Sequence, residues 1–376
     1  MAMNGADALV RVLVENGIDT CFSNPGTTEM HLVAGLTAGT GIANHLCLFE
    51  GVATGAADGF ARMAGRPAAT LLHLGPGLAN GIANLHNARK AATPVLNIVG
   101  EHALPHIAHN APLTADIAGL ARPVSKVVTT LRSAAEIGPA TRAMLVEMQS
   151  GERGVGTLIV PNDIAWGEAA ADNEPPVALP PRAAPDAAAI GAAAEALTRP
   201  GAALILGAPH ITRRMQALAL GIAAKTGARL LAEAATSRTS RGGGLPVVAR
   251  IPFQIDAALE TLKDTRTAVL AGARAPVAFF AYPGRPSELL PSDCRKLTLA
   301  APKPMSRPRS KRWRIASAPP RPIRWNCPAG AARRSDHPRG PGRRRRSCPA
   351  RRRHRRRRIR HQWRGAAPGL RRWSGA

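Results

Sequence analysis

The pattern of hydrophobic and polar positions between residues 44 and 100 predicts strands and helices in alternation. Continuous apolar runs at 45–49, 68–74 and 94–100 have the length of buried strands, and helix-length segments of mixed polarity separate them. Strands that follow one another through helices in this way pair in parallel, because the crossover returns the chain to the same edge of the sheet. The stretch therefore predicts a parallel α/β sheet.

The same alternation continues on both sides of this stretch. Asn4 is a suitable cap for a helix whose apolar positions keep helical spacing up to Gly17, and a strand at 20–22 follows. The turn that comes next leads into a helix at 29–36. Two doubly wound parallel-sheet domains account for the order of the remaining elements. The pattern places strands at 124–129, 156–161, 202–207, 229–232, 267–270 and 277–281, and helices at 134–149, 186–198, 212–226 and 252–263.

Composition divides the chain of 376 residues into four segments. Residues 1–169 and 186–301 hold the two predicted α/β domains, and the proline-rich residues 170–185 are the linker between them. Residues 302–376 contain 26 Lys or Arg against one acidic residue, whereas residues 1–301 contain 25 basic and 23 acidic residues. The net charge of +27 therefore belongs almost wholly to the last segment.

The cysteines and the first residues indicate a soluble, cytoplasmic protein. The five cysteines show neither a C-x-x-C pair nor the even number of a disulfide framework, so a reducing compartment is expected. Met1 is not followed by a basic segment and an apolar core, and no apolar run approaches the roughly 20 residues that a membrane helix requires. We therefore expect neither a leader peptide nor a membrane span.

Glu50 and a glycine turn are the candidate functional features of the first domain. Glu50 directly follows the apolar run 45–49, and the carboxyl ends of parallel strands are where such sheets bind ligands. Glycine recurs every fourth residue from 51 to 59, which leaves one face of the next helix without side chains and favours close packing there, with contact between subunits as one candidate. The turn at 75–77 has the backbone freedom to present amide groups to a ligand at a helix N-terminus.

The order and spacing of these features resemble a known family. Glu50, the Gly-x-x-x-Gly-x-x-x-Gly helix after it, the segment 73–77 and the strand at 94–100 are similar to the pyrimidine-binding domain of thiamine diphosphate enzymes, in the group of acetolactate synthases and benzoylformate decarboxylases. The likeness is strong over residues 4–165 and fainter up to about residue 300. It implies an acetolactate synthase-like enzyme that decarboxylates or ligates 2-oxoacids through a C2 ylid, and that assembles as a dimer or tetramer.

The resemblance implies roles for three residues. Glu50 matches the glutamate that bonds N1′ of the aminopyrimidine and so promotes loss of the C2 proton, for which its carboxyl group should be desolvated beside Phe49 and Val52. Thr27 matches a residue that faces the substrate carboxylate, and His73 matches a histidine that donates or accepts a proton near the substrate. The alternatives are structural: a carboxylate favoured by a helix dipole, a helix cap, and a hydrogen-bonded histidine at a strand end.

The resemblance also implies cofactor contacts at the glycine turn. Gly75, Pro76, Gly77 and Asn80 would lie beside the bound thiamine diphosphate. The family holds the diphosphate and its Mg²⁺ in a third domain with a Gly-Asp-Gly motif, and this sequence contains no such motif. We therefore predict that the chain holds only the pyrimidine half of the cofactor and contributes no metal ligand.

Other parts of the sequence depart from the acetolactate synthases. Where those enzymes have Gly-Gln and later Phe-Gln-Glu, this chain has Gly100-Glu101 and the stretch 110–116, so acetolactate formation itself is not expected. The family's six-stranded middle domain sometimes holds ADP or FAD. The glycines at 242–244 lack the G-x-G-x-x-G order and the preceding strand of a dinucleotide site, so they do not predict a flavin.

Three histidines within eight residues, His102, His106 and His109, could ligate a metal ion. We favour a solvated loop instead. Pro105 disfavours the helix that would bring the first two histidines to one face.

Residues 302–376 have two interpretations. They hold one Leu, three Ile and no Val or Phe, so they cannot form a core and are expected to be disordered. The arginine run 351–360 and the tryptophans could bind RNA or DNA through phosphate contacts and base stacking, which gives an alternative function. Arg, Pro, Ala and Gly together are also typical of a GC-rich coding sequence read out of frame. We favour the out-of-frame interpretation, because the family resemblance ends abruptly at this point.

Overall fold

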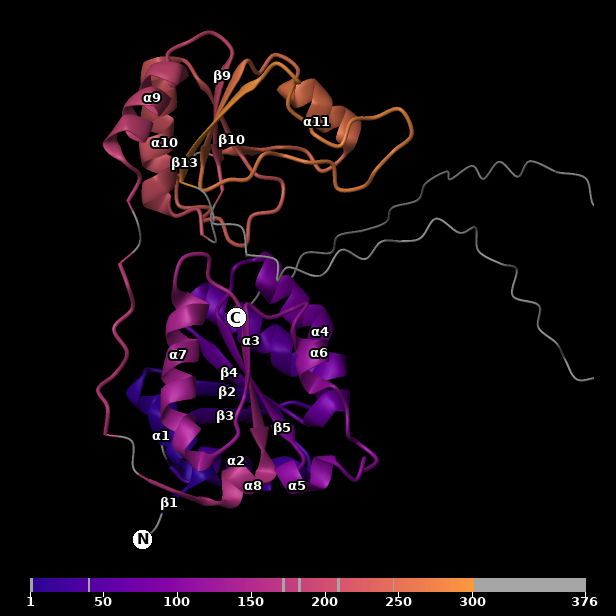
Figure 1. Ribbon diagram of the computed structural model, residues 1–376. Helices are drawn as coiled ribbons and strands as arrows, with labels where there is room; N and C mark the ends of the chain where they lie inside the picture. Colours follow the sequence, from indigo (N-terminus) through magenta and orange to yellow (C-terminus); the bar gives the residue numbers. More distant parts are fainter. Residues whose placement is uncertain are drawn as a thin grey trace, which may run out of the picture. The chain divides into compact units, whose positions relative to one another are not determined.

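Two parallel sheets, each covered by helices, form the framework of the described part of the molecule. The computed structural model describes residues 3–39, 41–170, 173–181, 184–207, 210–245 and 247–300. One sheet belongs to the first half of this sequence and the other to the second half (Figure 1). The predicted parallel α/β fold is thus confirmed. The predictions for residues 302–376, a disordered basic tail that could bind nucleic acid, lie outside the described residues.

The first sheet has six strands, all parallel, in the order β3-β2-β4-β5-β7-β6. Its central strands, β4 (Ala68–Leu72) and β5 (Val95–Glu101), are buried at every position, because helices cover both faces. The other strands are β2 (Thr20–Asn24), β3 (Ala43–Leu46), β6 (Val127–Thr130) and β7 (Gly156–Pro161). Near the start of the chain, β1 (Met3–Asn4) pairs antiparallel with β8 (Glu168–Ala169).

Two layers of helices cover this sheet (Figure 1). One layer is formed by α1 (Gly5–Glu15), α2 (Met30–Thr37) and α7 (Ile137–Gln149), and the other by α3 (Glu50–Ala64), α4 (Leu74–Lys90) and α6 (Ile117–Ala121). The apolar side chains of each helix layer pack against one face of the sheet and form a separate hydrophobic cluster there. The predicted cap of α1 is confirmed, since the Asn4 side chain accepts a hydrogen bond of 2.8 Å from the Asp7 amide. Short turns complete the connections: η1 (Thr27–Glu29), α5 (Leu104–Ile107), η2 (Ala134–Glu136) and α8 (Asn162–Trp166).

A row of buried hydrogen bonds, called here the polar row, crosses the middle of the first sheet. Thr70 on β4 donates to the Asn97 side chain at 2.7 Å, and Asn97 on β5 donates to Thr157 on β7 at 3.1 Å. The Thr157 hydroxyl also lies 2.7 Å from the hydroxyl of Ser125. Because each of these buried groups has a partner, the polar row fixes the register of three neighbouring strands without leaving an unpaired dipole in the core.

The second sheet has five strands within the described residues, all parallel, in the order β11-β10-β9-β12-β13. They are β9 (Ala202–Leu206), β10 (Arg229–Ala232), β11 (Ala249–Arg250), β12 (Thr267–Ala271) and β13 (Arg295–Ala300). Helices α9 (Ala187–Leu197) and α10 (Arg213–Thr226) lie on one face and α11 (Ile255–Leu262) on the other (Figure 1). Asp186 and Thr212 cap the first two helices through bonds of 2.6 Å and 3.2 Å to backbone amides.

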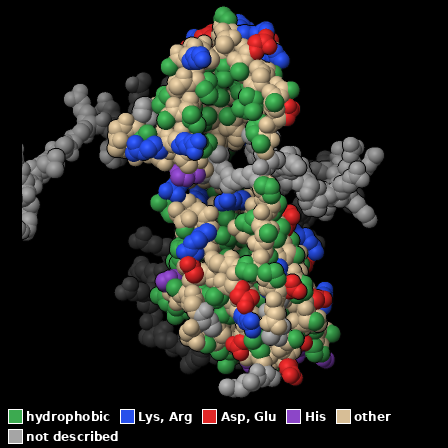
Figure 2. Space-filling model, turned by 90° about the vertical axis from the view of Figure 1, so that its left-hand side faces the viewer, with side chains coloured by type: hydrophobic (Ala, Val, Ile, Leu, Met, Phe, Trp, Pro, Cys, Tyr) green, Lys and Arg blue, Asp and Glu red, His purple; other side chains and the backbone are tan. Residues whose placement is uncertain are grey.

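The outer face of α9 and α10 carries exposed apolar side chains. Ile190, Leu218 and Ile222 are 49%, 59% and 42% exposed, and Figure 2 shows hydrophobic side chains gathered over this helix layer. These helices therefore bury one apolar stripe against the sheet and leave a second one open. In the described ranges, no helix combines the length and the hydrophobicity that crossing a bilayer requires.

The sequence pattern misplaces one strand of the second sheet and misses two others, β13 and the two-residue β11. The run at 277–281 is not a strand, because Val277 forms only a single bridge with Glu288 while Phe279 is exposed on a loop. Phe279 from this run instead belongs to an aromatic cluster, in which the ring centroids of Phe253 and Phe279 lie 4.7 Å apart. The pattern misses β13 because its first two residues are basic and leave only a short apolar run after them.

A shortened chain that ends after residue 304 is expected to fold with the same thermal midpoint as the full chain. The hydrophobic clusters and both sheets of the described part lie within residues 3–300, so the deletion removes none of their contacts. Circular dichroism during thermal unfolding compares the two chains, and limited proteolysis gives a second measurement. A shortened chain that aggregates or melts many degrees lower would show that the last segment contributes to the core.

Candidate functional site

The carboxyl ends of four neighbouring strands meet at one edge of the first sheet. Strands β3, β2, β4 and β5 are adjacent and parallel, so the segments that follow them begin side by side. The chain continues from β2 to β3 on one side and from β4 to β5 on the other. The topological switch point, where sheets of this kind bind ligands, therefore lies between β2 and β4. Glu50 follows β3, Glu29 follows β2 and His73 follows β4.

Most of the predicted site residues come together here. The Asn80 side chain on α4 donates a hydrogen bond of 3.1 Å to Glu50 Oε2 at the start of α3. Gly77 lies against both catalytic candidates, since a Cβ atom at this position would lie 3.4 Å from Glu50 Oε1 and 3.3 Å from His73 Cβ. Glu50, His73, Gly77 and Asn80 therefore form one group. Thr27 is exposed at the start of η1, in the loop that follows β2.

Glu50 is half-buried in the described part of the chain, and the apolar side chains that the sequence places around it are exposed. The apolar side chains beside it point outward: Leu48 is 95% exposed, Leu46 72%, Val52 57% and Phe49 50%. We call these four residues the edge patch, because β3 is the edge strand and, among the described residues, no further strand of this sheet covers that side. An exposed apolar patch next to a candidate functional group indicates a surface that another molecule covers.

His73 is held by a buried carboxylate that the sequence analysis does not single out. Glu29, at the end of η1, is fully buried, and its Oε2 lies 2.7 Å from His73 Nδ1. The same oxygen accepts a hydrogen bond of 2.8 Å from the Gly26 amide. Burial raises the pKa of Glu29, although the Gly26 amide and His73 oppose this shift. Its other oxygen, Oε1, is buried and has no hydrogen-bond partner in the described residues.

Two glycines make room for the Glu29 carboxylate and the His73 imidazole. A Cβ atom at Gly100 on β5 would fall 1.8 Å from Glu29 Oε1, and one at Gly26 would fall 2.3 Å from His73 Nδ1. Atoms cannot approach so closely, so any other residue at these positions would displace the carboxylate or the imidazole. Both positions therefore require glycine because of space.

The helix after His73 begins earlier than predicted. α4 starts at Leu74, so residues 75–77 lie in its first turn and do not form the separate turn that the sequence predicts. Leu74 has a φ of +50°, and its side chain is fully buried. This left-handed conformation is strained for leucine, and it passes the chain from the strand end into the helix within one residue. Gly75 packs inward, where a Cβ atom would lie 2.5 Å from Ala115 Cβ, whereas Pro76 is exposed.

The three histidines after β5 form a row of rings. The ring centroids of His102 and His106 are 5.5 Å apart, and those of His106 and His109 are 5.9 Å apart. α5 begins at Leu104, after His102, and places Pro105 in its first turn, where no amide donor is needed. A helix that carries both His102 and His106 is therefore not formed, as the sequence predicts. In the part of the chain that the structure describes, no three His, Cys, Asp or Glu side chains are placed to hold a metal ion.

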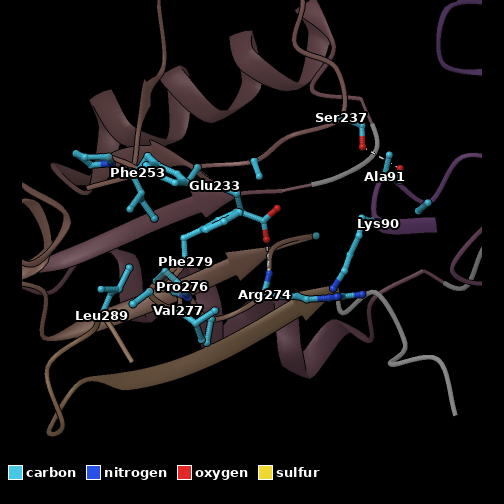
Figure 3. A pocket seen from close by; sticks show the side chains of 18 of the residues that line it. Lys90, Ala91, Glu233, Ser237, Phe253, Arg274, Pro276, Val277, Phe279 and Leu289 are labelled. Carbon is cyan, nitrogen blue, oxygen red and sulfur yellow. Dashed lines mark hydrogen bonds between the residues drawn. The ribbon is translucent and has the colours of Figure 1, made fainter. Parts of the chain in front are cut away.

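Another hollow lies at the carboxyl ends of strands in the second sheet (Figure 3). Glu233 after β10 and Arg274 after β12 belong to its wall. The Glu233 carboxylate accepts a hydrogen bond of 2.5 Å from the Arg274 amide, and burial raises the pKa of Glu233. Phe253, Val277 and Phe279 supply an apolar wall. The hollow contains none of the predicted site residues.

Glu29 is the functional candidate that sequence reasoning misses. The sequence pattern predicts it only as the first residue of a helix. One local signal was available, a carboxylate three residues after Gly26 that returns to the Gly26 amide as in a capping box. That signal predicts the bond to Gly26. It cannot predict the contact with His73, which lies 44 residues away and depends on the pairing of β2 with β4.

Comparison with known proteins finds relatives for most of the described chain. Residues 3–120 match the family model described as thiamine pyrophosphate enzyme, N-terminal TPP binding domain. The chain is 46% identical over 301 residues to a Mycobacterium tuberculosis protein provisionally named acetolactate synthase large subunit IlvX, an overlap that covers 80% of this chain and 58% of that protein. It is 28% identical over 162 residues to the acetolactate synthase isozyme 3 large subunit of Escherichia coli, covering 43% of this chain and 28% of that subunit.

Solved structures share the fold. The thiamine diphosphate-dependent 4-hydroxybenzoylformate decarboxylase of Rhodococcus jostii matches with a TM-score of 0.66 at 21% identity, over 79% of this chain and 56% of that one. The benzoylformate decarboxylase from Polynucleobacter necessarius matches with a TM-score of 0.65 at 20% identity, over 79% of this chain and 55% of that one. The chain thus spans a little more than half the length of these proteins and of its M. tuberculosis relative.

Replacing Gly100 by Ala is expected to destabilise the protein by about 1–3 kcal/mol, because the new methyl group overlaps the buried Glu29 carboxylate. Gly191→Ala on α9 is the matched control. No atom lies within 4 Å of the carbon added there, and alanine favours a helix interior by roughly 0.5–1 kcal/mol over glycine. Urea unfolding followed by circular dichroism measures both variants. Equal stability of Gly100→Ala and the parent would mean that Glu29 does not occupy this space.

Proposed function

Because this chain belongs to the acetolactate synthase-like family of thiamine diphosphate-dependent enzymes, we propose that it takes part in the decarboxylation or ligation of 2-oxoacids. In this proposal residues 3–120 hold the aminopyrimidine half of the cofactor. The observation that carries the proposal is the group formed by Glu50, His73, Gly77 and Asn80 at the carboxyl edge of the first sheet.

The residues around Glu50 suit the edge of an aminopyrimidine ring. Asn80 holds Glu50 Oε2 at 3.1 Å, so the carboxylate is oriented while its other oxygen stays open to accept a bond. Thiamine diphosphate, when bound, supplies the carbon nucleophile that adds to a 2-oxoacid. In this proposal, the role of Glu50 is to share a proton with ring nitrogen N1′. Phe49 and Val52 of the edge patch would exclude water from this contact once a second molecule covers them.

His73 and Thr27 serve the substrate side in this proposal. His73 Nδ1 faces Glu29, which leaves Nε2 as the atom that gives or takes a proton. Thr27 is exposed in the loop after β2, and its hydroxyl is a donor suited to the substrate carboxylate. Gly75 and Pro76 belong to the first turn of α4 beside the proposed cofactor site, where the inward packing of Gly75 fixes the start of the helix.

We assign the diphosphate and its Mg²⁺ to residues other than those described. The described residues contain no group of side chains suited to a metal ion, and the full sequence contains no Gly-Asp-Gly. The overlap with the M. tuberculosis relative covers 58% of that protein. In this proposal, a neighbouring chain supplies the other half of the site.

The edge patch is the proposed contact with that neighbouring chain. Its four side chains are exposed in the described structure, and burying apolar surface favours association by roughly 25 cal/mol per Å². On α3, a Cβ atom at Gly59 would meet no atom within 4 Å, so a partner backbone has room to approach. We propose that the edge patch joins this chain to a chain that carries the diphosphate-binding part of the site, since a copy of this sequence contains no Gly-Asp-Gly. The homo-oligomer that the family resemblance implies stays a prediction.

Two expectations stay predictions. Nucleic-acid binding depends on residues 302–376, which lie outside the described residues, and no contact in the described part favours it. A cytoplasmic location rests on the cysteine count and on the first residues of the chain.

A chimera tests the proposed function. It joins residues 1–300 of this chain to the C-terminal part of the M. tuberculosis relative that lies beyond the overlap. With thiamine diphosphate and Mg²⁺, it should release CO₂ from at least one 2-oxoacid of a panel that includes pyruvate and benzoylformate. Glu50→Gln in the chimera should lower turnover by about 10²–10⁴-fold, because an amide cannot share the N1′ proton.

Glu195→Gln on α9 is the control for this experiment, since the Glu195 carboxylate is exposed and pairs with Arg199 on its own helix. This variant should keep the turnover of the parent chimera. The proposal would be contradicted by a folded chimera that binds the cofactor and turns over no 2-oxoacid. A Glu50→Gln variant as fast as its parent would remove Glu50 from the catalytic role.

A further inference from the structure

We propose that Glu29 is a positioning residue for His73, which holds the imidazole in the tautomer whose Nε2 exchanges a proton with the substrate. This inference deepens the proposed function, since it rests on His73 acting beside the substrate. Its basis is a side-chain contact between the segments that follow β2 and β4, at the switch point of the first sheet.

The direction of the hydrogen bond between the two side chains follows from the ionised state of Glu29, which is the state that the proposal assigns to it. Glu29 Oε2 lies 2.7 Å from His73 Nδ1 and also accepts the Gly26 amide at 2.8 Å. An ionised carboxylate can only accept hydrogen bonds, so the shared hydrogen belongs to Nδ1. The lone pair of the neutral ring is then on Nε2, for which the described residues show no hydrogen-bond partner. An imidazole ordered in this way accepts a proton at one defined atom.

Neighbouring glycines restrict where the Glu29 carboxylate and the His73 imidazole can lie. Gly26 lies against the imidazole and Gly100 against the carboxylate, so closely that a Cβ atom would come within 2.3 Å and 1.8 Å of them. The Glu29 carboxylate also belongs to a side chain with no exposed surface. The Gly26 and Gly100 backbones therefore block movement of the imidazole and the carboxylate toward those two sides.

A carboxylate in this place is costly for the fold. Glu29 is fully buried, its Oε1 has no hydrogen-bond partner in the described residues, and burial raises its pKa. Burying a carboxylate with incomplete hydrogen bonding disfavours folding, whereas an apolar side chain of similar size would pack there without that penalty. A residue that served only the packing of this region would not need the charge. We therefore connect the charge with the one titratable side chain that it contacts, His73.

The test is nitrogen NMR on the full-length chain with ¹⁵N-labelled histidine, at pH 8 and without cofactor. The two ring nitrogens of a neutral imidazole differ strongly in chemical shift according to which one carries the hydrogen, and His73→Gln identifies the signals. We expect the parent to carry the hydrogen on Nδ1. Glu29→Leu should move it to Nε2, the tautomer that a free imidazole prefers. Glu29→Gln should keep it on Nδ1, because the amide oxygen can accept the same two bonds.

Glu101→Leu is the matched control. Glu101 is another buried carboxylate at the same sheet edge, and burial raises its pKa, but it accepts its hydrogen bond from the His102 amide. This variant should leave the His73 signals unchanged, and circular dichroism checks that each variant is folded. A parent with the hydrogen on Nε2, or a folded Glu29→Leu variant with the parent's tautomer, would overturn the inference. Because this measurement needs neither cofactor nor turnover, its outcome is separate from that of the chimera.

Discussion

The parallel pairing of β4 between β2 and β5 is the constraint on which the candidate site depends. The register sets Asn24 beside Leu72 and Leu72 beside Val99, so the segments after these three strands start at the same level. The polar row holds β5 to both of its neighbours inside the core, where a shifted register would leave buried dipoles without partners. A shift of one residue would also separate Glu29 from His73, two side chains that no local interaction brings together.

Strand order gives the two carboxylates of the site different surroundings. Glu29 follows a strand in the interior of the sheet and is enclosed on every side, with glycines where larger residues would not fit. Glu50 follows the edge strand β3 and stays open beside the edge patch. A group that meets a cofactor needs an open approach, whereas a group that orients another side chain needs rigid walls. The same architecture therefore supplies both kinds of position a few residues from the ends of adjacent strands.

How far the sequence predicts this molecule depends on whether the determining contacts are local. The strand Gly156–Pro161 is predicted at its observed bounds, because a continuous apolar run between polar segments is a local signal. The start of α4 is not, since the strained backbone of Leu74 persists only because tertiary packing buries its side chain. The run at 277–281 fails for the opposite reason. Its residues are hydrophobic enough for a strand, but they meet a neighbour through only one bridge.

The candidate site shows the same division. A resemblance in local motifs selects Glu50, His73, Gly77 and Asn80, and the structure brings these four together. It does not select Glu29, because an acidic residue at the start of a helix is a common capping feature and its meaning depends on a partner from another strand. Sequence patterns identify residues that stabilise a helix or a strand. A fully buried carboxylate with one oxygen that has no partner in the described residues destabilises the fold, so such patterns do not select it. Glu29 lowers the stability of the fold where an apolar side chain would raise it. Such a costly residue indicates a functional role, because function is the usual reason for a group that disfavours folding.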